Sequence, residues 1–344
     1  MNNLKKENVF LKQLGNAKAV PVMLVLFLQF VCFLIFAPKV FSGYRIYMSF
    51  FQTVPPQLVL ALGLTLVITA GEIDLSFASV VAFSGFVFSY VFRATGLAFP
   101  ALFCALASGA LVGVINGVLI ARLRVPSIMA TLASNFFWGG LTVLLCGGLN
   151  WSIKEIRNTF LHTLLVGRIG GIFPAQALWG VGLAVLLWFI LNRHRFGESI
   201  LFIGDNTDVA RVMGINVENT KIILFTVNGI IASFAAVLLT LEITNFYTTQ
   251  GQGFLLPVMA AVFIGGTSIS GGEGTIVGTF FGMYIIGSLE AGVVATGIGG
   301  YWVRLTTGLV MAASVIINVN IKSRGKKIID TIKDSVFFKA FKKE

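Results

Sequence analysis

The residue types that most often carry out catalysis are scarce in this 344-residue chain. It has two histidines, His162 and His194, and neither has a neighbour that would complete a catalytic triad or a metal site. The three cysteines, Cys32, Cys104 and Cys146, lie in apolar runs without a CxxC pair, which is typical of packing residues. The sequence therefore predicts no catalytic residue, no bound metal and no cofactor.

One glycine-rich stretch, GGTSISGGEGT at 265–275, has the composition of a phosphate-binding loop. A Walker-type loop needs the pattern GxxxxGK[ST], in which the lysine reaches the phosphates, and this stretch has no lysine. If ATP drives a process in which this protein takes part, we expect a separate chain to hydrolyse it.

Ionisable residues interrupt the apolar runs, and each is a candidate for function because a charge inside a bilayer is costly. They are Glu72, Asp74, Glu242, Glu290 and Arg304. Asp74 also fits a helix cap, in which its carboxylate accepts hydrogen bonds from free backbone N–H groups. Glu290 and Arg304 lie at similar depths in successive runs, so a structural ion pair is an alternative for them.

Three asparagines, Asn116, Asn135 and Asn228, also lie within apolar runs. An amide at such a position bonds to a neighbouring helix or meets a polar solute, and bonding between helices is the more common role. With the carboxylates added, the candidate residues for a translocation path are Asp74, Asn135, Asn228 and Glu290.

The composition indicates which elements must position these side chains. Hydrophobic residues make up 56% of the chain and charged residues 11%, whereas soluble domains average about 45–50% and about 25%. Continuous apolar runs recur that are long enough to cross a bilayer core of about 30 Å as helices, and they lack the alternation of barrel strands. We predict an all-α integral membrane protein of about ten transmembrane helices, some of them broken or re-entrant, near residues 20–37, 54–70, 75–92, 97–121, 126–147, 173–191, 222–242, 257–267, 275–297 and 301–319.

The positive charges predict the orientation of these helices. With the N-terminus inside, eighteen of the 25 Lys and Arg residues fall in cytoplasmic segments and six fall outside. By the positive-inside rule, both termini are expected to be cytoplasmic. The net charge of +11 therefore reflects membrane topology, and no nucleic-acid partner is expected.

Two connections, 71–74 and 265–274, carry no positive charge, and the second is especially rich in Gly, Ser and Thr. Each is either a tight cytoplasmic turn or an unwound segment at membrane depth, which requires protein or water around its backbone. The remaining polar parts are a cytoplasmic segment at 1–19, a cytoplasmic stretch at 192–221 within the transmembrane domain 20–319, and a tail at 320–344. The tail has apolar and lysine faces, typical of a membrane-surface helix.

Small residues recur every four positions in two runs, which indicates helices whose backbones approach closely. The two stripes are Ala105, Gly109, Gly113 and Gly117, and Gly274, Gly278 and Gly282.

Four blocks carry a resemblance to a known family. They are GEIDLS at 71–76, VPSIMATLASNFFWGGLTVLLCGG at 125–148, GDNTDVARVMGINVENTK at 204–221 and AAVFIGGTSISGGEGTIVGT at 260–279. In order and spacing they resemble the permease subunit of bacterial ATP-binding-cassette importers for monosaccharides of the ribose and galactose type. The resemblance extends from the second to the tenth predicted span.

This resemblance implies a transport subunit, not an enzyme, in the bacterial cytoplasmic membrane. It implies an ATP-binding subunit, a second permease subunit in a homodimer or heterodimer, and an extracytoplasmic solute-binding protein. It also implies that 204–221 is the segment on which the ATP-binding subunit acts. The positions implicated are Gly204, Asn206, Ala210, Gly214, Ile215 and Asn216.

The chain departs from the family pattern at two carboxylates. Glu72 stands where the family usually has glycine, and Glu290 stands where it often has asparagine. These two carboxylates bear on the identity of the solute, while the resemblance implies a small hydroxylated molecule, most simply a monosaccharide. An ion-coupled secondary transporter that uses Glu72, Asp74 or Glu290 is the alternative.

Overall fold

The computed structural model describes residues 19–295 together with 302–303, 305, 308–309 and 312. Within this part, seven helices are long and apolar enough to cross a membrane, and a bent helix pair adds an eighth. The all-α membrane fold is therefore confirmed. The seven are α2 (Ala19–Phe36), α6 (Phe77–Thr95), α7 (Ala98–Ala121), α8 (Ser127–Cys146), α10 (Ala175–Arg193), α13 (Val217–Ile243) and α15 (Ile276–Ala295).

The bent pair is α4 (Tyr44–Thr53) followed by α5 (Pro55–Thr69), which meet at 48°. Pro55 and Pro56 begin α5, and since proline has no N–H to donate, the hydrogen-bond ladder breaks there. The sequence predicted only the α5 half, as 54–70, because α4 carries the polar side chains Arg45 and Gln52.

Nine of the ten predicted spans coincide with helices. The span predicted at 257–267 is the short helix α14 (Leu255–Ile264), which continues the turn η3 (Gln252–Phe254). At 1.5 Å per residue, these thirteen residues reach only roughly 20 Å, less than a bilayer core. The tenth, 301–319, lies outside the described residues apart from isolated positions. The count of about ten stays a prediction.

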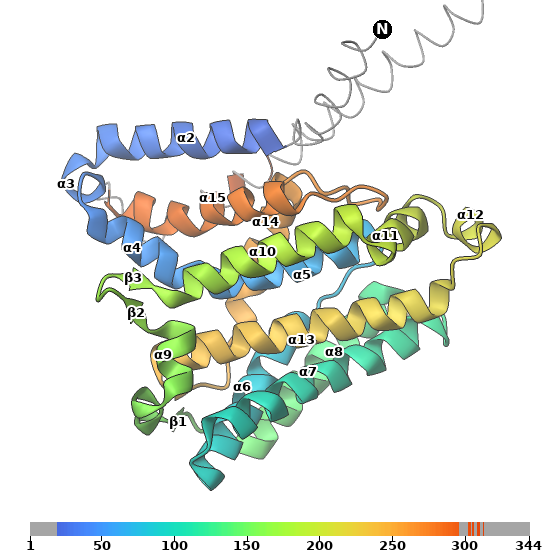
Figure 1. Ribbon diagram of the computed structural model, residues 1–344, viewed down its shortest axis with the longest axis horizontal. Helices are drawn as coiled ribbons and strands as arrows, with labels where there is room; N and C mark the ends of the chain where they lie inside the picture. The colour runs from blue at the N-terminus through green and yellow to red at the C-terminus, as the bar shows by residue number, and fades with distance from the viewer. Residues whose placement is uncertain (1–18, 296–301, 304, 306–307, 310–311, 313–344) are drawn as a thin grey trace, which may run out of the picture.

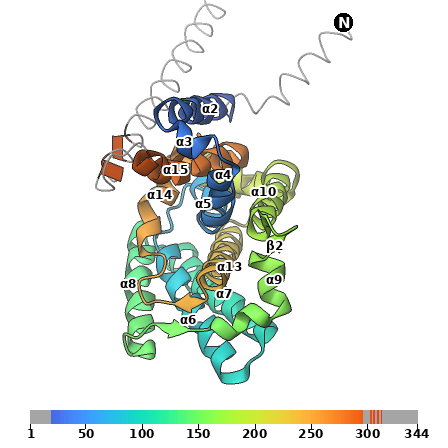
Figure 2. The same cartoon turned by 90° about the vertical axis from the view of Figure 1, so that its left-hand side faces the viewer.

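Helix α5 lies at the centre of the bundle (Figures 1 and 2), and every one of its residues except Gln57 is buried. It packs against α10, α13, α14 and α15, while α13 also packs against α6 and α7. Helices α2, α7, α8 and α10 expose large apolar side chains such as Phe27, Phe103 and Phe136. Such an outer surface suits lipid and would be costly in water.

The small-residue stripes lie at two close helix contacts, as the sequence predicted. A Cβ placed on Gly113 of α7 would lie 2.3 Å from the Phe225 carbonyl oxygen of α13, and one on Gly282 of α15 would lie 2.4 Å from the Ala261 carbonyl oxygen of α14. Only glycine permits backbones to approach this closely.

The connections between the helices gather at two ends of the bundle (Figure 1). At one end lie α11 (Arg195–Asp205) and α12 (Thr207–Val212), and we call it the α12 end. At the other end, called the β end, lie α3 (Pro38–Phe41), η2 (Lys154–Asn158), α9 (Phe160–Val166) and two small antiparallel pairings. The strand β1 (Trp151–Ser152) pairs with β4 (Asn245–Phe246), and β2 (Arg168–Ile169) pairs with β3 (Phe173–Pro174).

Both glycine-rich connections lie at the α12 end, and neither is helical. The first, between α5 and α6, enters the bundle: Asp74 contacts Asn228, roughly 16 Å along α13 from its start. The second, between α14 and α15, has an exposed tip at Ile269 and Ser270. The two lie against each other, since a Cβ on Gly271 would lie 2.8 Å from Gly71 Cα, and the Gly272 N–H donates to the Thr69 carbonyl oxygen at the end of α5 at 2.9 Å.

A third unwound stretch, 247–251, was missed from the sequence. It leads from β4 at the β end to Gly251, where a Cβ would lie 2.7 Å from the Ala78 carbonyl oxygen in the first turn of α6. The buried Gln250 amide donates to Thr240 Oγ1 at 2.8 Å and to the Ala236 carbonyl oxygen at 3.3 Å. The chain therefore crosses part of the bundle as irregular backbone before η3 and α14 begin.

Candidate functional site

The polar stretch predicted at 192–221 projects from the bundle at the α12 end (Figure 1). It consists of α11, α12 and the first turns of α13, residues 195–221, and is called the α11–α12 projection below. Two asparagines fix its turns. Asn206 Oδ1 accepts from the N–H groups of Asp208 and Val209 at 3.0 and 3.1 Å, and Asn216 Oδ1 accepts from the Asn219 N–H at 2.9 Å. Each side chain thus caps the helix that follows it.

The other implicated positions hold the projection together. Ala210 is fully buried with Ile203 and Val217, and Ile215 packs against this cluster. Gly214 follows α12 with a φ of +85°, a left-handed conformation that glycine adopts without strain. Five of the six residues implicated by the resemblance therefore shape the projection itself.

The sixth, Gly204, joins the projection to the membrane helices. A Cβ placed on it would lie 1.9 Å from the Thr69 carbonyl oxygen at the end of α5 and 2.5 Å from the Gly272 nitrogen. A Cβ on Gly71 would lie 3.7 Å from Gly204 Cα. The end of α11 is thus packed directly against both glycine-rich connections at the α12 end.

The outer surface of the projection is partly apolar. Val209 of α12 is 52% exposed, and the exposed fractions of Val212 and Met213 reach 90% and 56%. Beside them, Arg211 pairs with Glu218 at 3.1 Å and with Asp208 at 3.6 Å. Exposed apolar side chains rimmed by charged ones are typical of a protein interface.

Three of the polar residues predicted inside the apolar runs come together in the core. Asp74 Oδ1 accepts from the Ser76 N–H at 2.8 Å and from the Ser76 hydroxyl at 2.6 Å, and Asp74 Oδ2 accepts from the Asn228 amide at 2.8 Å. Asn116 donates to the Ser76 hydroxyl at 2.8 Å. Asp74 therefore satisfies a backbone N–H just before α6 and links this turn to α13, while Ser76 links it to α7.

The other two candidates for the translocation path lie elsewhere. Asn135 is partly buried on α8, and Glu290 is exposed on α15. Neither contributes a hydrogen bond to Asp74. The predicted partner of Glu290, Arg304, lies outside the described residues. The composition of the path stays a prediction.

Sequence reasoning missed the partner of Glu72. Its carboxylate pairs with the Lys221 ammonium in the second turn of α13, and both side chains are largely buried. The lysine had been counted only as a cytoplasmic charge. Their opposite charges are the signal in the sequence that could have suggested the pair. Because 149 residues separate the two positions, the sequence does not indicate that they meet.

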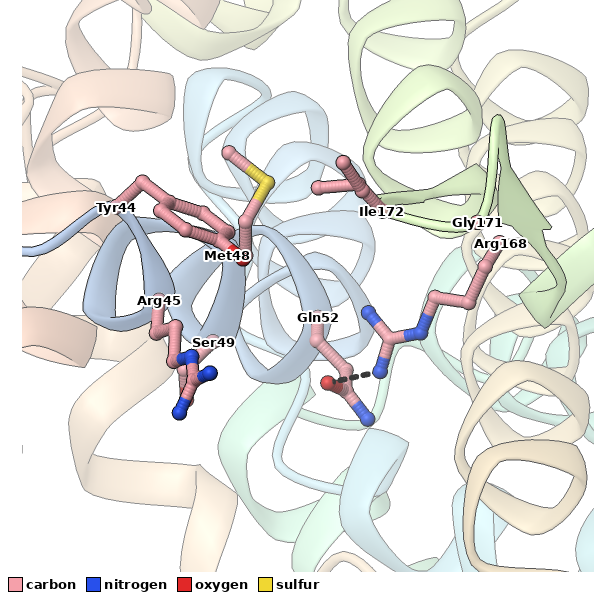
Figure 3. Close-up of a pocket in the computed structure, with 8 residues that line it drawn as sticks. All are labelled: Tyr44, Arg45, Met48, Ser49, Gln52, Arg168, Gly171 and Ile172. Atoms are coloured by element: carbon pink, nitrogen blue, oxygen red, sulfur yellow. Dashed lines mark hydrogen bonds between the residues drawn. The ribbon is translucent and has the colours of Figure 1, made fainter.

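A second polar cluster lies toward the β end, around Glu242. Its carboxylate accepts hydrogen bonds from the amide of Gln52, at the bend between α4 and α5, and from Gln176 at 2.9 Å. Arg168 in turn donates to Gln52 (Figure 3). Gln52 and Arg168 border an open pocket of about 260 Å³, lined by Tyr44, Arg45, Met48, Ser49, Gln52, Arg168, Gly171 and Ile172.

Among the described residues, no group of three His, Cys, Asp or Glu side chains is placed to hold a metal ion. Cys32 and Cys104 are exposed on the bundle surface, and Cys146 is buried, all three as free thiols. His194 caps α11 by accepting from the Phe196 N–H at 3.1 Å. The geometry of the described part is that of polar contacts between helices and of an exposed projection.

Comparison with known proteins gives a family match over residues 46–315, to the family described as the branched-chain amino acid transport system / permease component. Relatives include the ribose import permease protein RbsC of Escherichia coli K12, 34% identical over 263 residues that cover 76% of this chain and 81% of the relative. The fructose import permease protein FrcC of Rhizobium meliloti is 32% identical over 319 residues, or 87% and 84%. The autoinducer 2 import system permease protein LsrC of Yersinia pseudotuberculosis is 31% identical over 262 residues, or 76% and 73%.

The family match covers most of the chain, and each of these relatives is matched over more than two thirds of its length. The resemblance seen in the four sequence blocks is thereby confirmed, as is a multi-pass protein of the inner membrane that is a transport subunit and not an enzyme. The chain belongs to the permease-component family of ATP-binding-cassette importers.

Proposed function

We propose that the protein forms the solute path of an ATP-driven importer for a small hydroxylated solute, most simply a monosaccharide. The relatives named above are import permeases for ribose, fructose and autoinducer 2, which supports this class of solute. The family description names branched-chain amino acids, so leucine is the competing solute to test.

The observation that carries the proposal is the α11–α12 projection. It exposes Val212 and Met213, while Gly204 packs its inner end against the backbones that lead out of α5 and into α15. An ATP-binding subunit that docks on the apolar tip would act on these helices through that contact. Its closure would then shift the bundle between outward-open and inward-open states.

The path is proposed to lie between this chain and a second permease subunit, identical or homologous. Glu290 is exposed on a single chain, and a carboxylate in an apolar helix requires a polar neighbour or water. Asn135 is the candidate on α8, and Asp74 with Asn228 holds the inner part of the path in shape. An extracytoplasmic solute-binding protein would deliver solute to the β end.

Ion-coupled transport finds less support. Glu72 is paired with Lys221, and Asp74 accepts three hydrogen bonds. Both carboxylates are therefore bound to protein groups. A coupling ion or proton would have to displace these groups before it could bind.

The test is to purify the chain with its ATP-binding and solute-binding partners, reconstitute it in liposomes, and measure uptake of labelled D-ribose, D-fructose and L-leucine. We expect ATP-dependent uptake of a sugar and none of leucine. Uptake by this chain alone under a sodium or proton gradient would contradict the proposal.

Docking on the projection is tested by Val212→Asp and Gly214→Trp, which place a charge and a bulky ring at the tip. Both variants should insert normally but lose the copurifying ATP-binding subunit and the ATP-dependent uptake. Leu149→Asp, at an exposed apolar residue near the β end, is the matched control and should retain that subunit. Retention of the subunit by both tip variants would refute this docking surface.

A further inference from the structure

The segment 71–76 between α5 and α6 is attached to α13 at two points. The Glu72 carboxylate pairs with the Lys221 ammonium, and Asp74 Oδ2 accepts from the Asn228 amide at 2.8 Å. Lys221 and Asn228 are seven residues apart, two helical turns, so they lie on the same face of α13. Glu72 and Asp74 are two residues apart in a non-helical segment, and their side chains contact this same face of α13.

The backbone of the same segment is attached to α8. The Ile73 N–H donates to Ser127 Oγ at 3.2 Å, and the Leu75 N–H donates to Thr131 Oγ1 at 3.0 Å. Contacts therefore alternate along the segment, with Glu72 and Asp74 toward α13 and the intervening backbone toward α8. The segment therefore bridges α8 and α13.

The same segment touches the α11–α12 projection at two places. Gly204, near the end of α11, lies against Gly71 and the Thr69 carbonyl. Lys221, in the second turn of α13, is the last residue of the projection. Any displacement of the projection therefore reaches 71–76 through a backbone contact and through an ion pair.

The ion pair is well suited to transmit displacement. The Glu72 and Lys221 side chains are only 13% and 15% exposed. Charges that are largely removed from water attract each other more strongly and are little screened by salt. With the Asp74–Asn228 hydrogen bond alone, the segment 71–76 could rotate about that single contact. Two attachments to one face of α13 fix the direction in which the segment runs.

We propose that Glu72 and Lys221 are positioning residues for transport, and that their ion pair makes 71–76 and the adjoining start of α6 move with the α11–α12 projection. This inference rests on the proposed function, because it assumes that the ATP-binding subunit acts on the projection. It gives a role to the carboxylate that stands where the family usually has glycine. Neither residue touches solute in this scheme.

The experiment uses hydrogen–deuterium exchange of the complete complex, compared without nucleotide and after trapping with ADP and vanadate, so that no solute has to be known. In the unaltered protein, trapping should change deuterium uptake in peptides from both 195–221 and 71–76. In Glu72→Gln and Lys221→Met the change should persist in 195–221 and be lost from 71–76. The exchanged variant Glu72→Lys with Lys221→Glu should restore it.

A single substitution leaves one buried charge without a partner, which lowers stability as well. The double variant Glu72→Gln with Lys221→Met removes both charges and is therefore decisive: it should fold, bind the ATP-binding subunit and show no change in 71–76. Glu155→Gln, which removes an exposed carboxylate at the β end, is the control and should behave like the unaltered protein.

The outcomes separate the two proposals. If trapping changes neither peptide of the unaltered complex, the assignment of the projection as the docking site fails. If trapping changes 195–221 but not 71–76 in the unaltered complex, or changes both peptides in the double variant, the role of Glu72 and Lys221 is refuted while the proposed function stands.

Discussion

Asp74 shows how a single charged residue is accommodated in this core. Its two carboxylate oxygens accept from the Ser76 N–H, the Ser76 hydroxyl and the Asn228 amide, and the residue is 3% exposed. The network joins the α5–α6 turn to α7 and α13. Buried polar groups that are satisfied in this way specify one arrangement of helices, because any other arrangement would leave donors unpaired.

We expect Asp74→Ala to lower the free energy of unfolding by at least about 2 kcal/mol, because the Ser76 N–H and the Asn228 amide lose their acceptor in a buried site. Asp208→Ala is the control, since that side chain is 93% exposed and its ion pair is weak. Thermal unfolding of the purified chains in detergent measures both. Equal midpoints for the two variants would show that the network contributes no stability.

At the scale of elements, α13 is the helix that connects the parts of the molecule. It begins in the α11–α12 projection, packs against α5, α6 and α7, and ends beside β4. Its contact with α7 is the closest, because Gly109, Gly113 and Gly117 face its backbone. Helices that pack through glycine lose little side-chain entropy and gain dispersion contacts along their whole length.

Gly113→Leu is expected to destabilise the protein by about 3 kcal/mol, because the new side chain collides with the backbone at Phe225 and Thr226 and cannot be accommodated by a rotamer change. Gly140→Leu on α8 is the matched control, since a Cβ there meets open space. Both are compared by thermal unfolding in detergent. A Gly113→Leu midpoint equal to that of Gly140→Leu would contradict the close contact.

At the scale of the whole molecule, the two ends differ in charge and in form. The six cations predicted outside belong to the β end, for example Lys39 of α3 and Arg168 of β2, whereas Arg195 and Arg211 belong to the α11–α12 projection. The projection is formed by one continuous stretch of chain, 195–221, while the β end is built from short pieces contributed by separate connections (Figure 2). An importer needs such a difference, because its two faces would meet different partners.

The orientation is tested with single cysteines in a chain whose Cys32, Cys104 and Cys146 are replaced by serine. Glu155→Cys at the β end should react with a membrane-impermeant maleimide in intact spheroplasts. Asp208→Cys on the projection should react only after permeabilisation, because the excess of positive charge places that end in the cytoplasm. The reverse labelling pattern would invert the topology.

The sequence by itself determined the helices, their order and the two ends. Apolar runs of bilayer length that lack the alternation of barrel strands form helices, since only helices and closed barrels satisfy the backbone in lipid. The stripes at Gly113 and Gly282 already indicated close packing. The caps at Asn206 and Asn216 are local, so the shape of the projection also followed from nearby residues. The bend at Pro55 and the helical character of 44–53 were harder to predict, because α4 is amphipathic.

Only the tertiary structure decided which distant groups meet. Glu72 pairs with Lys221, and Gln52 bonds to Glu242, although more than a hundred residues separate the members of each pair. Gly204 packs between Thr69 and Gly272, which are also distant from it in the sequence. The tertiary structure also shows irregular backbone inside the bundle at 247–251. From the sequence, these polar residues are indistinguishable from an ordinary surface connection. These features depend on how helices pack around α5, and a periodicity along one chain carries no information about the neighbour that a side chain will face.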